Sequence, residues 1–334
     1  MTNKKRAPDG VQWTIAIPPE VKCEYAETSI GEYFQNIDVM LITEQRCREK
    51  FIERYEYDPG EYYYVPFTAY EGVAALGATL VFTDQHEVMI ENQGNILTEP
   101  AHVMALAPAD PWKYPRFVWG AESYRQMKTR FPDKSVGISP GQEGPVTSAV
   151  LLRGTRFFMD CYDAPELAHR LLSVVTDTFI HFCEAVSEVT GQRSTALGIA
   201  DDHSGNLAPQ MWDEFVLPYY ERIYSELDIE TRVMHSELVR REHFPYLEKL
   251  NLSQIDLGED PYISVADALS LGKPFFWHIK TCQEMLMGNP DSIKRAYENA
   301  VNEGAKGILT ELSVGVPPEN IRAFIDVARK FEPV

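Results

Sequence analysis

The sequence lacks long hydrophobic runs, paired cysteines and an excess of positive charge. No stretch of about 18 apolar residues occurs in its 334 residues, so it predicts no membrane-spanning helix. The five cysteines are an odd number without a CxxC pair, which favours reduced thiols over a disulfide framework. The formal net charge of -19 argues against a general affinity for nucleic acid or an anionic membrane surface.

The N-terminus lacks the features of a secretion signal. Its first ten residues, MTNKKRAPDG, carry charge but are followed by no apolar segment. A cytoplasmic location is therefore expected, and residues 1–12 are predicted to be a flexible tail.

The glycine motifs of nucleotide-binding folds, GxGxxG and GxxxxGK[ST], are also absent, which disfavours an open doubly wound sheet. What the chain does contain is a series of short apolar runs separated by helical patterns. Eight candidate strands in a chain of this length favour a single closed (β/α)8 TIM barrel over residues 61–334, preceded by an N-terminal helical extension over 13–60. The candidate strands are 62–67, 78–82, 135–139, 195–200, 231–235, 252–257, 274–279 and 307–312.

Polar side chains follow most of these strands. In a (β/α)8 barrel the carboxyl ends of the strands meet at one rim, where active sites lie. Carboxylates and histidines gathered there could bind a metal ion or transfer protons, although Asp, Ser and Thr at such positions also cap helices. The candidates are Asp84, Asp201, Asp202, His203, His235, Glu237, Glu259, His278 and Glu311.

Two of these groups each allow a structural and a functional interpretation. His235 and Glu237 are two residues apart, so on an extended strand both side chains point to the same side and could reach one ion. Alternatively, Ser236 caps the next helix and Glu237 lies in its first turn. Between Asp201 and Asp202, an Asx turn would use one carboxylate and leave the other for ligand contact.

Several ordered motifs resemble one enzyme superfamily. These are Gly144-Pro145 followed by TSAVLLRGTRFFMDCYDAPELAHRLL, then ADDHSGNLAPQMWDEFVLPYYERI, VMHSELV and GVPPENIRAF. Between Tyr62 and Phe331 the chain is similar to the uroporphyrinogen decarboxylase-like superfamily, which includes uroporphyrinogen decarboxylase and the corrinoid-linked coenzyme M methyltransferases. The resemblance implies a (β/α)8 barrel, in agreement with the strand pattern.

The methyltransferase branch implies a divalent metal, zinc in the first place, and a corrinoid on a separate partner protein. Those enzymes bind zinc through a His-x-Cys element, in which His235 matches the histidine and Glu237 replaces the cysteine. Glu259 lies where the related cobalamin-independent methionine synthases place a carboxylate ligand, and Glu311 could complete the site. Carboxylate ligands would also admit manganese or iron.

The leading hypothesis is thus a metal-dependent methyltransferase that exchanges a methyl group between a small molecule and a corrinoid protein. Its proposed metal ligands are His235, Glu237, Glu259 and Glu311. Its proposed catalytic residues are Asp84, Asp201 and Asp202, with His203 and His278 binding substrate.

The alternative is a decarboxylase-like lyase acting on a tetrapyrrole or another carboxylic acid. Asp84 resembles the pyrrole-contacting aspartate of uroporphyrinogen decarboxylase, but the arginine-rich N-terminal motif of that enzyme is missing before Tyr62. A polycarboxylate would need arginines to neutralise it. The nearby supply is Arg116, Arg125, Arg153 and Arg156. A non-catalytic ligand-binding barrel is a third possibility.

Overall fold

The computed structural model describes residues 10–84 and 86–332. Most of the predicted flexible tail, 1–12, lies outside the described residues. The part of it that is described is not a tail, because Val11 is buried and its backbone N–H donates to the carbonyl of Phe331 at 2.7 Å. Strand β1 begins at the next residue, Gln12.

Eight of the described strands pair in parallel, in three separate sheets. The sheet orders are β1-β10-β9, β2-β5 and β6-β7-β8, and β3 and β4 form an antiparallel hairpin. The bounds are β1 Gln12–Ala16, β2 Tyr63–Tyr64, β3 Thr79–Val81, β4 Met89–Glu91, β5 Val136–Gly137, β6 Ala196–Ala200, β7 Thr231–His235, β8 Gln254–Asp256, β9 Trp277–Ile279 and β10 Gly307–Glu311.

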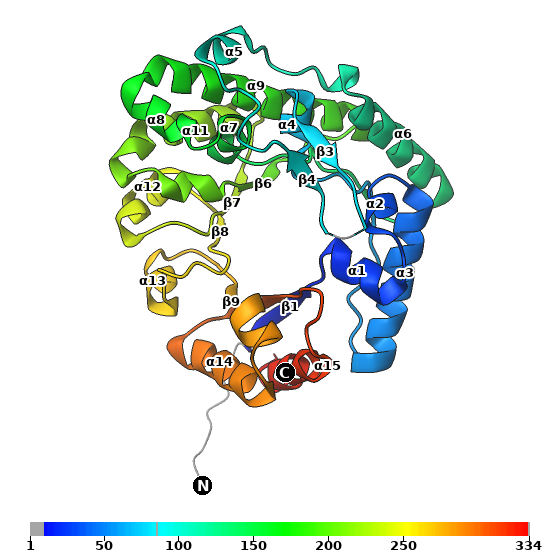
Figure 1. The fold of residues 1–334 in the computed structure, drawn as a ribbon. Coiled ribbons are helices and arrows are strands. Elements are labelled where there is room, and N and C mark those ends of the chain that lie inside the picture. Colours follow the sequence, from blue (N-terminus) through cyan, green and yellow to red (C-terminus); the bar gives the residue numbers. More distant parts are fainter. Residues whose placement is uncertain (1–9, 85, 333–334) are drawn as a thin grey trace.

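The parallel strands lie inside a ring of helices. In Figure 1, β6, β7, β8, β9 and β1 follow one another along the inner side of the ring. Single backbone hydrogen bonds connect neighbouring sheets, from Ile255 N–H to the Pro274 carbonyl (3.1 Å) and from Gly144 N–H to the Ala200 carbonyl (2.6 Å). Within residues 10–84 and 86–332 the strand ladders do not close into one barrel. The fold is therefore an α/β architecture with parallel sheets and outer helices.

The longest helix of the described residues, α9, lies along one side of the ring in Figure 1, and its buried residues recur at helical spacing. No helix in the described part of the chain is long and apolar enough to span a membrane. The α-helices are α1 Pro19–Ala26, α2 Ile30–Tyr33, α3 Ile37–Tyr55, α4 Glu71–Ala75, α5 Pro100–Ala105, α6 Pro115–Arg130, α7 Pro145–Arg153, α8 Arg156–Asp163, α9 Pro165–Thr190, α10 Trp212–Phe215, α11 Leu217–Glu226, α12 Phe244–Lys249, α13 Val265–Ser270, α14 Pro290–Glu303 and α15 Pro318–Ala328.

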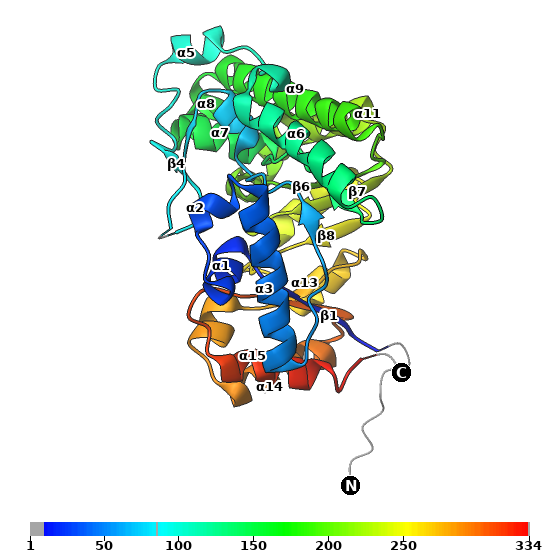
Figure 2. The same ribbon diagram turned by 90° about the vertical axis from the view of Figure 1, so that its right-hand side faces the viewer.

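The segment predicted as a helical extension, 13–60, contains helices α1, α2 and α3, which lie side by side in Figure 2. Its beginning differs from that prediction, because β1 pairs with β10 over its whole length. The predicted strand at 78–82 differs as well. Thr79–Val81 form β3, which pairs antiparallel with β4 in a hairpin, so β1 supplies the eighth parallel strand in its place.

Candidate active site

Two histidines and two aspartates meet at the carboxyl ends of β6, β7, β8 and β9. His235 ends β7, and its Nδ1 lies 3.0 Å from Oδ2 of Asp256, which ends β8. The other oxygen of Asp256 lies 2.9 Å from Nε2 of His278 on β9. On the opposite side of the His235 ring, Nε2 lies 3.4 Å from Oδ1 of Asp202. We call these four residues the His235 cluster.

The charges in the His235 cluster stabilise one another. Burial disfavours a charged imidazole, but the hydrogen bond to Asp256 and the charges of Asp256 and Asp202 outweigh it and raise the pKa of His235 to about 9. Burial works against a charged Asp256 as well, yet its bonds to His235 and His278 hold its pKa well below the usual range. His235 is therefore a cation at neutral pH that bears a proton on each nitrogen.

Asp201, the neighbour of Asp202, binds backbone N–H groups and a tyrosine hydroxyl instead of a histidine. Its side chain is fully buried, and it accepts the backbone N–H of Thr147 (2.6 Å) and Val146 (3.4 Å) in the first turn of α7, and the hydroxyl of Tyr220 (3.1 Å). Gly144 makes room for it, since a Cβ there would lie about 2.5 Å from the Asp201 Cβ. Burial raises the pKa of Asp201 to about 6 despite these bonds. Asp201 anchors α7 and has no free oxygen for substrate.

Three of the four predicted metal ligands are the glutamates Glu237, Glu259 and Glu311. Their carboxylates lie near one another, but they are not directed at a common position that a metal ion could occupy. Glu237 Oε1 accepts the backbone N–H of Glu259 at 3.2 Å and packs on Gly258, where a Cβ would lie 2.4 Å away. Glu259 in turn accepts the backbone N–H of Thr281. Burial raises the pKa of Glu311, and the negative charges of Glu259 and Glu237 add to the rise.

The fourth predicted ligand, His235, has both nitrogens directed at aspartates. Across the residues that the structure describes, no three His, Cys, Asp or Glu side chains are arranged so that they could hold a metal ion. The predicted ligand set does not fit a metal ion in this geometry, and we derive no reaction step through one.

Asp84 and His203 lie outside the His235 cluster. Asp84 accepts the Ser29 hydroxyl (2.5 Å) and the Gly31 backbone N–H (3.1 Å) at the start of α2, and these bonds lower its pKa. His203 donates its backbone N–H to the Thr147 hydroxyl, and its ring lies against Asn206. Burial lowers the pKa of His203, which makes its ring neutral at neutral pH.

Glu143, which follows β5, faces the same region. Burial raises its pKa to about 8, and the charges of Asp202 and Asp201 contribute. Its Oε2 is buried without a hydrogen-bond partner among the described residues. Glu143 therefore bears a proton at neutral pH, next to a histidine that is itself charged.

Two of the four arginines expected for a polycarboxylate substrate are held in internal ion pairs. Arg116 binds Glu71 at 2.8 Å, and Arg153 binds Asp160 at 2.7 Å. Both also donate to backbone carbonyls. The other two are exposed, where Arg125 pairs with Glu122 and Arg156 donates to Asn95. The described contacts direct none of the four to the His235 cluster.

Comparison with known proteins identifies the family. The sequence pattern described as "Uroporphyrinogen decarboxylase (URO-D)" matches residues 18–331. The chain belongs to the uroporphyrinogen decarboxylase family. The resemblance inferred from the sequence motifs is thereby confirmed.

Curated members of the uroporphyrinogen decarboxylase family match only part of the chain. A uroporphyrinogen decarboxylase from Xanthomonas euvesicatoria is 33% identical over 150 residues, which cover 44% of this chain and 42% of that protein. One from Xylella fastidiosa is 28% identical over 185 residues, or 51% of each. The chain thus spans about half the length of the curated relatives it matches.

A solved structure matches over nearly the whole length. It is a methyltransferase from Methanosarcina mazei, with a TM-score of 0.68 and 16% sequence identity, covering 99% of this chain and 95% of that one. At this identity the match establishes a shared fold.

Sequence reasoning missed two residues of this family member's site. Asp256, which bridges the two histidines, lies inside a predicted strand, whereas the candidate residue near it, Glu259, lies after that strand. Its alternation with the buried Ile255 was the available signal. Glu143 does follow a predicted strand, but only the structure shows that it is buried and unpaired.

Proposed function

We propose that this chain is a methyltransferase that exchanges a methyl group between a small methylated molecule and a corrinoid bound to a partner protein. The observation that supports this is His235, a doubly protonated histidine at the strand ends, held through Nδ1 by Asp256 with Nε2 on the side of Asp202. Such a group is suited to protonate a leaving group.

The chemistry requires an acid at this position. When a methyl group leaves oxygen or nitrogen, the bond from carbon to the heteroatom breaks and its electron pair remains on the heteroatom. The proton on His235 Nε2 would neutralise that developing charge, and Asp256 would keep the ring oriented. The corrinoid, when bound with its partner protein, supplies the group that accepts the methyl. In the reverse direction neutral His235 would take the proton back.

The charge of the site favours methyl transfer over decarboxylation of a polycarboxylate. Asp202, Glu237 and Glu259 lie around the two histidines, whereas Arg116 and Arg153 are engaged elsewhere. A substrate with many carboxylates would meet repulsion there without a compensating arginine cluster.

The remaining elements of the proposal are untested. The predicted divalent metal, with zinc first, at His235, Glu237, Glu259 and Glu311 is not used in this proposal, because both nitrogens of His235 face aspartates, and elemental analysis of the purified protein would check it. The closed (β/α)8 barrel also stays a proposal, supported by the eight parallel strands. A cytoplasmic location is expected as well.

The function is tested by incubating purified protein with cob(I)alamin and a panel of methyl ethers, methylamines and methyl thioethers. Formation of methylcobalamin, followed by its absorbance, is the expected result. His235→Ala should reduce the rate by about 10²–10⁴-fold, the usual contribution of a general acid. His102→Ala, at an exposed histidine on α5 to which no role in the site is assigned, is the matched control and should retain most activity. Transfer by no substrate in either direction, or full activity in His235→Ala, would contradict the proposal.

A carboxy-lyase remains the second candidate, because the curated relatives are named uroporphyrinogen decarboxylase. It is tested by supplying uroporphyrinogen and measuring the loss of carboxyl groups from the product by mass spectrometry. We expect no turnover. Turnover that is lost in Asp84→Ala would favour the lyase.

A further inference from the structure

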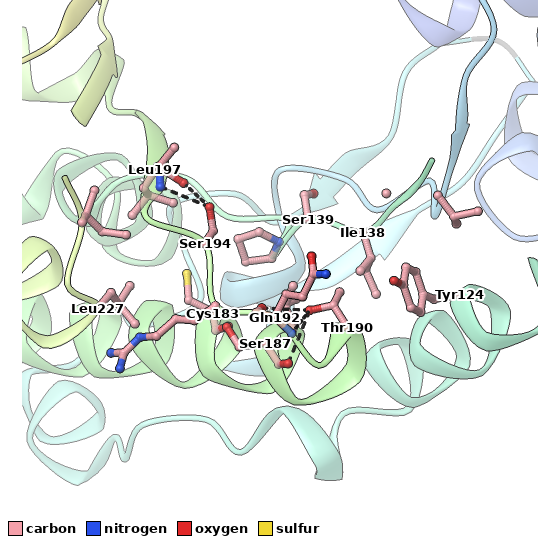
Figure 3. Close-up of a pocket in the computed structure, with 17 residues that line it drawn as sticks. Tyr124, Ile138, Ser139, Cys183, Ser187, Thr190, Gln192, Ser194, Leu197 and Leu227 are labelled. Atoms are coloured by element: carbon pink, nitrogen blue, oxygen red, sulfur yellow. Dashed lines mark hydrogen bonds between the residues drawn. The ribbon is translucent and has the colours of Figure 1, made fainter. Parts of the chain in front are cut away.

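A cavity lies away from the His235 cluster, between β5, β6 and the C-terminal half of α9. Its volume is about 450 Å³, within the range of small-molecule sites. Figure 3 shows Leu197 and Ser194 on one side, Ile138 and Tyr124 on the other, and Cys183 between them on α9. We call it the β5–β6 cavity. It borders the beginning of β6, whereas Asp202 follows the end of that strand.

The cavity exists because β5 and β6 do not pair. In the described sheets, β5 pairs with β2 and β6 pairs with β7. The hydrogen bond from Gly144 to Ala200 joins a residue that follows β5 to the last residue of β6, whereas Gly137 of β5 and Ala196 at the start of β6 are exposed. The facing edges of β5 and β6 therefore border the cavity, and their backbone N–H and C=O groups form no sheet hydrogen bonds with each other.

The cavity lining is apolar with some hydroxyl groups, and unlike the acidic chain as a whole it carries positive charge. Val186, Leu197 and Ile229 contribute apolar surface, and Ser139 and Thr190 contribute hydroxyls. The protein has 50 acidic residues, yet no carboxylate is among the described residues that line the cavity. Among the lining residues that the structure describes, the one charged group is the half-exposed guanidinium of Arg193.

Arg193 can bind a further anion. Its Nη1 lies 3.2 Å from Asp228, whose side chain is 75% exposed, and its Nη2 donates to the carbonyl of Glu226. A guanidinium has five N–H donors, so these two contacts leave donors for a ligand. The Asp228 pair is exposed and thus weak, and a ligand carboxylate could compete with it.

We propose that the β5–β6 cavity is a second binding site, for a small aromatic carboxylate. The apolar body fits between Leu197, Val186 and Ile229, and the carboxylate pairs with Arg193. The same cavity disfavours a cation, because it offers no carboxylate among its described lining. This site is separate from the proposed methyl-transfer chemistry and does not depend on it.

Isothermal titration calorimetry with three ligands of similar shape tests the proposal. Benzoate should bind with one site per chain. Benzyl alcohol, which lacks the charge, should bind about tenfold more weakly, the loss of one charge-assisted contact. Benzylammonium should not bind measurably. Binding of benzylammonium as tight as that of benzoate would overturn the proposal.

Three variants locate the binding. Ser187→Phe places a ring in the cavity from α9 and should abolish benzoate binding, with the fold checked by circular dichroism. Arg193→Gln, at a half-exposed position, should reduce benzoate affinity to that of benzyl alcohol, whereas Arg125→Gln, an exposed arginine with one acidic partner, should not. His235→Ala should leave benzoate binding unchanged. Loss of binding in His235→Ala with retention in Arg193→Gln would assign the ligand to the other site and overturn the proposal.

Discussion

The strand ends present acidic side chains in two different settings. In the His235 cluster, Asp256 and Asp202 face imidazole rings, and both remain partly exposed. At the starts of α7 and α2, Asp201 and Asp84 bind backbone N–H groups instead. What differs is the partner of the carboxylate oxygens. An acid whose oxygens are bound by a helix terminus stabilises the fold, and one that faces a histidine can take part in chemistry.

The comparison is sharpest for the two neighbours Asp201 and Asp202. Asp201 lies beneath α7, with Gly144 in close contact, so its carboxylate meets two backbone N–H groups and a tyrosine hydroxyl. Asp202 is 39% exposed and accepts the backbone N–H of Glu237. One peptide unit therefore separates a structural aspartate from a candidate catalytic one.

The largest expected effect comes from removing the structural member of that pair. Asp201→Ala leaves the N–H of Thr147 and the hydroxyl of Tyr220 buried without a partner, and should lower the free energy of unfolding by about 3 kcal/mol. Asp202→Ala should lower it by less than about 1 kcal/mol while reducing methyl transfer. Urea unfolding and activity assays on both variants check this. Equal loss of stability would remove the distinction between the two settings.

The second effect concerns Glu143, whose pKa is raised from 4.5 to about 8. The folded state keeps this proton where the unfolded state has lost it. The stability that Glu143 contributes is thus fully present below about pH 4.5 and is lost as the pH rises through 8. The Glu143→Gln side chain is neutral at every pH. Between pH 6 and pH 8 the free energy of unfolding of wild type should therefore fall by about 2 kcal/mol relative to that of Glu143→Gln.

Urea unfolding of both proteins at these two values measures the gain. Glu122→Gln, on the exposed surface of α6, is the control and should show no such pH dependence. A constant difference between Glu143→Gln and wild type would show that Glu143 is ionised in the folded protein.

The sequence predicted the α/β class because hydrophobic spacing is a local property. Seven of the eight candidate strands overlap parallel strands of the structure, but 78–82 forms a hairpin instead. The apolar segment at Gln12–Ala16 was missed because only its pairing with β10 identifies it as part of the sheet. Whether an apolar run joins a given sheet depends on partners distant in sequence, which periodicity does not report.

The site was predicted less completely, for the same reason. The sequence placed His235, Asp202 and His278 together at the strand ends, and the structure shows His235 beside Asp202 and both histidines beside Asp256. The roles assigned to these residues stay predictions. The sequence could not show that Asp256 connects the two histidines, or that Asp201 and Asp84 bind helix starts. Hydrogen-bond partners are set by how helices approach the strand ends, and that geometry is absent from residue spacing alone.

The third prediction tests the functional setting through Asp256. Asp256→Asn keeps the size of the side chain but removes the charge that raises the pKa of His235. Methyl transfer at neutral pH should fall about tenfold, as expected for loss of an orienting partner. The alkaline limb of the pH–rate profile should shift as well, because kcat/KM should decline above about pH 7 instead of about pH 9. An unchanged pH profile would exclude His235 as the proton donor.

The smallest effect is expected at Asp84. This residue lies in the helix-capping setting, although a decarboxylase mechanism would require it for catalysis. Its carboxylate is used by the Ser29 hydroxyl and the Gly31 N–H, so Asp84→Ala should leave kcat/KM for methyl transfer within about twofold of wild type. Asp84→Asn, which can still accept both bonds, should match the wild type more closely. A loss of activity in both variants, with the fold intact, would place Asp84 in contact with substrate. The helix-capping and histidine-facing acids would then share one active site.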